Sequence, residues 1–260
     1  MTTRGSVSRL AVLIDSENIS STMADGLFRE IAEIGSTMVR RIYGDFSNPQ
    51  SNGWISVLGR HGLVPQQQFP GPTGKNSTDI LMVIDTMDLL HSARFDAFCL
   101  VTSDSDFTRL ATRIREQGLD VYGFGTQKSP ERFRLACSKF TYVENLHHDA
   151  PANNAKTKKA PLRPAQEAVP IIKAVFVQMG TPDGWVALSD VVAKLAVHKT
   201  DFDPRTYGFA TLSELVRRQN AFIVSQPQGG GERMKIRGKK SKPVVADVVD
   251  QEAGTSLTEP

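Results

Sequence analysis

The stretch "LVTSDSDFTRLATRIREQGLDVYGFG", residues 100–125, decides the fold class. An apolar run ends in two aspartates, and an amphipathic segment follows that Gly118 closes. A second apolar run begins directly after that glycine, so the stretch predicts a strand, a helix and a strand in succession. Two strands joined by one helix lie parallel in a sheet, which places this stretch inside an α/β domain.

The same alternation extends over residues 9–146. Apolar runs predict strands, and the segments between them have the spacing of helices that cover a sheet. We therefore expect a doubly wound, mostly parallel sheet with helices on both faces. The expected strands are 9–14, 37–44, 63–69, 97–103 and 120–125, and the expected helices are 20–34, 52–62, 78–93, 107–118 and 130–140.

The composition excludes some classes of protein. The chain has 260 residues and a net charge of +3, so affinity for nucleic acid has to come from local basic patches. The two cysteines, Cys99 and Cys137, lack the spacing of metal ligands and fit reduced, buried thiols. No apolar run approaches the length of a membrane span, and the first residues lack the apolar core of a signal peptide. These features predict a cytoplasmic protein that is not bound to a membrane.

Composition also predicts how the chain divides into domains. Residues 8–146 form the α/β domain, and 147–166 are rich in proline, alanine and lysine, as a linker is. Residues 167–237 predict three helices followed by a glycine-tipped hairpin, the order of a winged helix-turn-helix. Residues 238–260 carry no hydrophobic period and predict a disordered tail.

Acidic residues lie where the predicted strands end. Asp15 ends the first strand, Asp104 and Asp106 end the fourth, and Asp79 lies in the first turn of the helix before the fourth strand. In a doubly wound sheet the carboxyl ends of the strands line one edge, and ligands bind there where the strand order reverses. We expect these four acids to meet at that edge.

Acids that crowd together repel unless a cation is bound. Mg²⁺ or Mn²⁺ prefers oxygen ligands and neutralises charge on a phosphoryl oxygen. Asn18 offers an amide that orients a carboxylate, and Lys75 offers a charge for a phosphate. Each acid taken singly has another explanation, since Asp104 or Ser103 can cap the helix that follows and Asp79 favours a helix dipole. For Asp45, after the second strand, a place in this acidic site and a place on the solvated surface are equally favoured.

Three segments carry a resemblance to a known family. "AVLIDSENIS" (11–20), "KNSTDILMVIDTMDLL" (75–90) and residues 100–125 closely resemble the NYN domains of the LabA-like group, relatives of PIN-domain nucleases. The resemblance implies a PIN-like fold and a metal-dependent ribonuclease site over about residues 8–146. It implies that Asp15, Asp79, Asp104 and Asp106 hold one or two Mg²⁺ or Mn²⁺ ions, with Asn18 and Ser103 in support.

The second unit resembles the OST-HTH, or LOTUS, domain, most specifically in "FDPRTYGFATLSELV" (202–216). The resemblance implies a small winged helix that binds RNA or docks a protein partner. A basic face fits that role, since clustered positive charge binds phosphate. The basic face expected on this unit comprises Arg205, Arg217, Arg218, Arg233, Lys235, Arg237, Lys239 and Lys240, of which Arg217, Arg218, Arg233, Lys235 and Arg237 are expected to contact RNA. Ordinary solvated surface is an equal alternative for Arg217 and Arg218. On the first domain, Lys75 and Ser103 are expected to contact RNA.

Three hypotheses for function follow. The first is a metal-dependent endoribonuclease whose second domain brings in RNA. The second is an RNA-binding or regulatory adaptor that keeps the fold without catalysis. The third, a phosphatase of haloacid-dehalogenase type, is disfavoured because "LIDSEN" lacks the second aspartate that such enzymes place two residues after the first. The sequence leaves the oligomeric state open.

Overall fold

The computed structural model describes residues 7–69, 76–147, 161–179, 185–225 and 235–238. Lys75, Arg233, most of the predicted linker and the predicted tail after residue 238 lie outside these residues. Of Lys235 the structure describes the backbone alone. Among the described helices, none combines the length and the apolar character that crossing a membrane requires.

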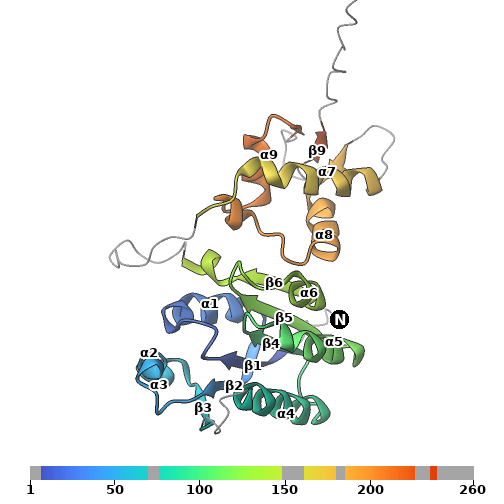
Figure 1. Ribbon diagram of the computed structural model, residues 1–260. Coiled ribbons are helices and arrows are strands. Elements are labelled where there is room, and N and C mark those ends of the chain that lie inside the picture. The colour runs from blue at the N-terminus through green and yellow to red at the C-terminus, as the bar shows by residue number, and fades with distance from the viewer. Residues whose placement is uncertain (1–6, 70–75, 148–160, 180–184, 226–234, 239–260) are drawn as a thin grey trace, which may run out of the picture.

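A six-stranded sheet forms the centre of the first domain (Figure 1). Its order is β3-β2-β1-β4-β5-β6, and every neighbouring pair is parallel, as the sequence predicts. The chain runs outward from β1 to β3 and then returns to β4, so the strand order reverses between β1 and β4. The strands are β1 (Arg9–Asp15), β2 (Ser36–Gly44), β3 (Val64–Gln67), β4 (Ala97–Val101), β5 (Asp120–Gly125) and β6 (Lys139–Tyr142).

Helices cover both faces of this sheet. On one face α4 (Ser77–His91), α5 (Thr108–Glu116) and α6 (Glu131–Ala136) pack on the alternate residues Leu13 and Phe98. On the other face α1 (Ala24–Ile34) and the short helices near Trp54 pack on the strand residues that point the opposite way, such as Val12 and Cys99. All five residues of β4 are buried, which explains why this strand reads as a continuous apolar run.

The structure differs from the expected helix over 52–62. This segment forms two one-turn helices, α2 (Asn52–Ile55) and α3 (Leu58–His61). Gly62 then takes a left-handed conformation with φ +60°, which ends α3 and leads into β3.

The second unit is a small three-helix domain with an antiparallel sheet of order β7-β9-β8. The sequence of residues 205–219 predicts a single helix, but the structure has two, because Gly208 takes a left-handed turn with φ +84° and Thr211 caps a new helix. The elements are α7 (Ala168–Met179), β7 (Val186–Ala187), α8 (Leu188–His198), the 3₁₀ helix η6 (Pro204–Tyr207), α9 (Leu212–Arg218), β8 (Phe222–Ser225) and β9 (Lys235–Gly238).

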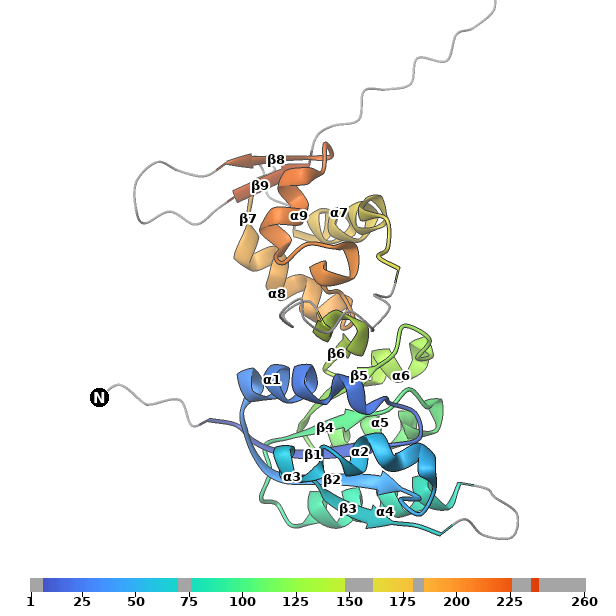
Figure 2. The ribbon, with the colours of Figure 1, turned by 90° about the vertical axis from the view of Figure 1, so that its left-hand side faces the viewer.

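The second unit docks on the β6 end of the sheet, as Figures 1 and 2 both show. The backbone N–H of Phe140 in β6 donates to the carbonyl of Thr200 at 2.8 Å. Asn145 donates to the hydroxyl of Thr206 at 2.9 Å, and Arg134 forms an ion pair with the buried carboxylate of Asp201. These bonds join the two domains directly.

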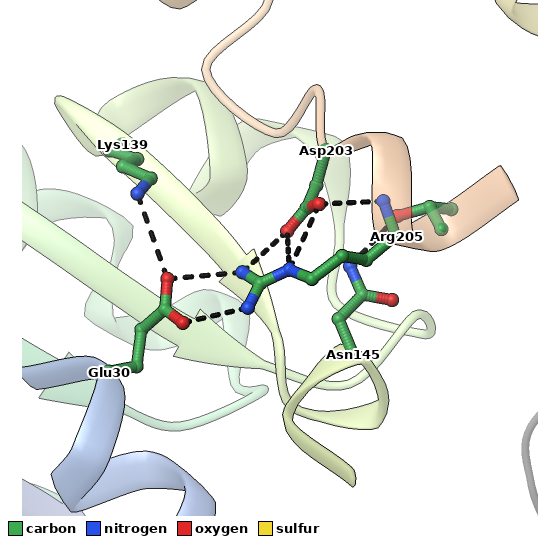
Figure 3. Close-up of polar contacts among 6 residues, drawn as sticks. Glu30, Lys139, Asn145, Asp203 and Arg205 are labelled. Atoms are coloured by element: carbon green, nitrogen blue, oxygen red, sulfur yellow. Dashed lines mark hydrogen bonds and ion pairs between the residues drawn. The ribbon is translucent and has the colours of Figure 1, made fainter. Parts of the chain in front are cut away.

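Arg205 lies in this interface (Figure 3). Its guanidinium binds both carboxylate oxygens of Glu30, at 2.8 and 3.0 Å, and also the carboxylate of Asp203. The side chain is only 23% exposed. Arg205, which the sequence assigns to the basic face, therefore lies at the domain interface with acids bound to its guanidinium, and its contribution to that face stays a prediction.

Candidate functional site

A pocket of about 740 Å³ opens at the carboxyl edge of the sheet. It spans the point where the strand order reverses and continues past the end of β2 toward β3. Its lining is polar and comes from the turns after β1, β2 and β3, the start of α4 and the turn after β4. The lining includes Ser16, Glu17, Asn18, Asp45, Asn48, Gln50, Ser51, Trp54, Gln68, Thr78, Asp79 and Asp104.

Asp15 lies behind this pocket, with 1% of the residue exposed. One carboxylate oxygen accepts from the backbone N–H groups of Glu17 and Asn18. The other accepts from the side chains of Asn18, at 2.6 Å, and Thr102, at 2.8 Å. Burial raises the pKa of Asp15, and these hydrogen bonds oppose the shift. Asp15 thus orders the turn after β1.

Asp104 lines the pocket and also caps the helix that follows. Its backbone N–H donates to the hydroxyl of Thr102, which itself donates to Asp15. One oxygen of Asp104 accepts from the backbone N–H of Asp106 at 2.8 Å. The capping and the site interpretations of Asp104 are therefore compatible, since the cap bond occupies only one of its two oxygens.

Asp79 lies in the first turn of α4 and also lines the pocket. Burial and the charges of nearby carboxylates raise its pKa to about 6; those carboxylates are Asp15, Asp104, Glu17 and Asp106. Acids from the ends of β1 and β4 and from the start of α4 thus act on one another electrostatically.

Glu17 is a pocket residue that the sequence reasoning missed. It follows β1 by two residues, and its carboxylate accepts from the hydroxyl of Thr78 at 3.2 Å. This bond ties the turn after β1 to the start of α4. Its position in "LIDSEN", just past the end of the strand, could have indicated that Glu17 lies at the carboxyl edge.

Two further acids differ in their surroundings. Asp45 lines the far part of the pocket, and hydrogen bonds from Ser47 and Gln67 lower its pKa. Asp106 is exposed and is not part of the lining. Gly44 precedes Asp45 where the chain passes Ser16 closely: a Cβ at position 44 would lie 2.0 Å from the Ser16 hydroxyl.

The donor set suits a hard divalent cation, since it offers carboxylate, amide and hydroxyl oxygens. Within the described part of the chain, however, no three acidic, histidine or cysteine side chains are grouped so that they could hold a metal ion together. Mg²⁺ usually keeps several waters and binds through only one or two carboxylates. Asp79 and Asp104 fit that mode of binding.

The described basic residues of the second unit are partly exposed. Arg217 and Arg218 end α9 and are exposed. The guanidinium of Arg237 lies 4.9 Å from the ring centre of Trp185, so these two side chains stack. Ser103, on the first domain, accepts from the backbone N–H of Thr126 and joins the turns after β4 and β5. Contacts of these residues with RNA remain predictions.

A parallel α/β domain with acids at the reversal of strand order, followed by a winged-helix unit, is the architecture of a PIN-like protein with an accessory domain. Residues 9–144 match the NYN domain and residues 164–234 match the OST-HTH/LOTUS domain. The chain therefore belongs to the NYN family. NYN is a family of nuclease domains, and OST-HTH domains bind RNA.

No curated protein matches the chain. Among solved structures, the chain is similar to a protein of unknown function from Vibrio parahaemolyticus. The two share 17% sequence identity with a TM-score of 0.45, over 54% of this chain and 94% of that one.

Proposed function

We propose that the protein is a divalent-metal-dependent endoribonuclease of the LabA-like group, whose pocket hydrolyses RNA phosphodiester bonds and whose second domain binds RNA. The observation that carries the proposal is the pocket itself. In an NYN domain, Asp79 and Asp104 line one cavity at the reversal of strand order, with Glu17 beside them. The raised pKa of Asp79 supports it, because such crowding favours a bound cation.

Each residue has a distinct part in this proposal. Asp79 and Asp104 hold Mg²⁺ or Mn²⁺, and Asp106 lies next to them. Asp15 keeps Asn18 and Thr102 in position, and Thr102 in turn holds the backbone of Asp104. When bound, the metal supplies charge neutralisation at the phosphoryl oxygens and a lower pKa for water.

RNA cleavage with and without Mg²⁺ or Mn²⁺ tests the proposal. We expect Asp104→Asn to lower the rate by at least about 100-fold, since it removes a charge that meets the metal. Asp88→Asn is the matched control, because Asp88 is an exposed aspartate on α4 outside the pocket lining. Calorimetric titration with Mn²⁺ should show binding to the wild type and to Asp88→Asn and much weaker binding to Asp104→Asn.

A second candidate function is an RNA-binding adaptor without catalysis. Two observations favour it: four hydrogen bonds already occupy both oxygens of Asp15, and among the described residues no three acids are placed to hold a metal ion together. RNA binding that EDTA leaves unchanged, together with no cleavage of single-stranded or folded RNA, would identify the adaptor.

A further inference from the structure

The pocket continues well past the acids that the proposed chemistry uses. It follows the carboxyl edge from the turn after β4, across β1 and β2, to the turn after β3. Neighbouring strands lie about 4.8 Å apart, so the two ends of this edge are separated by roughly 10 Å or more. The far end, which we name the amide end, is lined by Asn48, Gln50, Ser51 and Gln68, beside Asp45.

The amide end differs from a phosphate site. The described residues that line the pocket include no lysine, arginine or histidine. Asp45 adds a negative charge there, because hydrogen bonds from Ser47 and Gln67 lower its pKa. Phosphate groups are therefore disfavoured at this end, whereas an uncharged group with several hydrogen-bond donors and acceptors is favoured.

Two glutamines offer side chains to such a group. Gln50 is exposed within the lining, and among the described contacts its side chain has no hydrogen-bond partner. Gln68 donates through its side-chain nitrogen to the Phe69 carbonyl at 3.2 Å, which leaves its side-chain oxygen as an acceptor. Asn48 holds the backbone of Gln50 by accepting its N–H at 3.0 Å.

Trp54 lines the pocket at this end but is too buried to stack on a base. It is only 3% exposed, and its indole N–H donates to the Ile19 carbonyl at 2.9 Å. Recognition at the amide end therefore depends on hydrogen bonding at the edge of the ligand.

We propose that the amide end is a nucleoside subsite, in which Gln50 and Gln68 hydrogen-bond the polar edge of an unpaired base next to the phosphate held at the acidic end. The inference rests on the proposed function, which places that phosphate. The Watson–Crick edge of a base is free for such contacts only when the base is unpaired, so the substrate at this point is single-stranded RNA.

The test uses one short RNA whose cleavage site has been mapped, and two derivatives that lack the base on either side of the cleaved bond. With the wild type, we expect loss of one of these bases to lower kcat/KM by about 10- to 50-fold, mainly through KM, as for two neutral hydrogen bonds. The double variant Gln50→Ala/Gln68→Ala should lose a similar factor on intact RNA but less than about 2-fold on that abasic RNA. Gln117→Ala, an exposed glutamine at the end of α5, is the matched control and should behave as the wild type.

Two results would overturn the subsite while the ribonuclease stands: equal cleavage of intact and both abasic RNAs, or an equal loss on all of them for the double variant. Affinities of the same RNAs for Asp104→Asn, measured with EDTA present, separate the two proposals. If the wild type cleaves no RNA, the proposed function fails, and the bases of one short single-stranded RNA are then removed one at a time for the binding measurement. In that case, binding that depends on the base and loses this dependence in the double variant supports the subsite, and binding that ignores the base overturns it.

Discussion

Acidic side chains gather in two regions of this molecule, with opposite electrostatic surroundings. At the domain interface the acids have basic partners: Arg205 binds Glu30 and Asp203, and Arg134 binds Asp201. At the carboxyl edge, Asp79 is surrounded by other carboxylates. The interface is therefore complementary within the chain, whereas at the edge the opposite charge would come from the proposed divalent cation.

The pKa shifts of Asp201 at the interface and of Asp79 at the edge have opposite directions. Burial alone favours neutral Asp201, but a hydrogen bond from Tyr142 and the charges of Lys199 and Arg134 outweigh it and lower the pKa. Burial also favours neutral Asp79, and the neighbouring acids add to that effect and raise its pKa to about 6. Burial acts in the same direction on both carboxylates, so the hydrogen bond from Tyr142 and the sign of the surrounding charge decide the outcome.

The largest effect that tests this comparison is on the stability of the interface. We expect Asp201→Ala to lower the free energy of unfolding by about 3 kcal/mol, because it leaves Arg134 partly buried without its partner. Denaturant unfolding measures this change. Asp25→Ala is the control, since Asp25 is 61% exposed and its ion pair with Arg60 should contribute at most about 1 kcal/mol.

The same variant should loosen the docking of the second domain. Limited proteolysis near residues 161–167 is then expected to be faster for Asp201→Ala than for Asp25→Ala. Equal stability of the two variants would show that the interface contributes no more than a surface ion pair.

At the carboxyl edge, removal of an acid should raise the free energy of unfolding instead of lowering it. Asp79 has a raised pKa in the folded protein, so its contribution to stability is full below about pH 4 and is lost as the pH rises through about 6. We expect Asp79→Asn, which stays neutral, to be more stable than the wild type at pH 7 without metal. The gain should be about 1 kcal/mol, because solvent screens a group that is only partly buried.

Thermal unfolding between pH 4 and pH 8, with EDTA, measures the difference between the two proteins. Mg²⁺ at about 100 times its Kd should then stabilise the wild type by roughly 2.7 kcal/mol and Asp79→Asn by much less. If the difference in stability between the wild type and Asp79→Asn did not change with pH, the crowding of these acids would be contradicted.

The sequence predicted some of these features and missed others for a physical reason. Strands such as β4 are buried on both faces, so their composition alone identifies them. The expected meeting of Asp15, Asp79 and Asp104 rested on strand order, and the structure places Asp79 and Asp104 in the pocket but turns Asp15 inward. The pair of Arg205 and Glu30 joins residues 175 positions apart, and no local pattern indicates which distant side chain a charge will meet.

The smallest expected effect is that of Arg218→Ala on RNA binding, which extends the comparison to basic residues. Unlike Arg205, it is exposed and has no acidic partner among the described residues, so it is available to RNA phosphates. In an Asp104→Asn background, Arg218→Ala should reduce the slope of log affinity against log salt concentration by about 0.7, as for one lost contact with single-stranded RNA. Arg94→Ala removes the same charge from an exposed site beside Phe95 and should leave the slope unchanged. An unchanged slope for Arg218→Ala would mean that this exposed arginine on α9 takes no part in RNA binding.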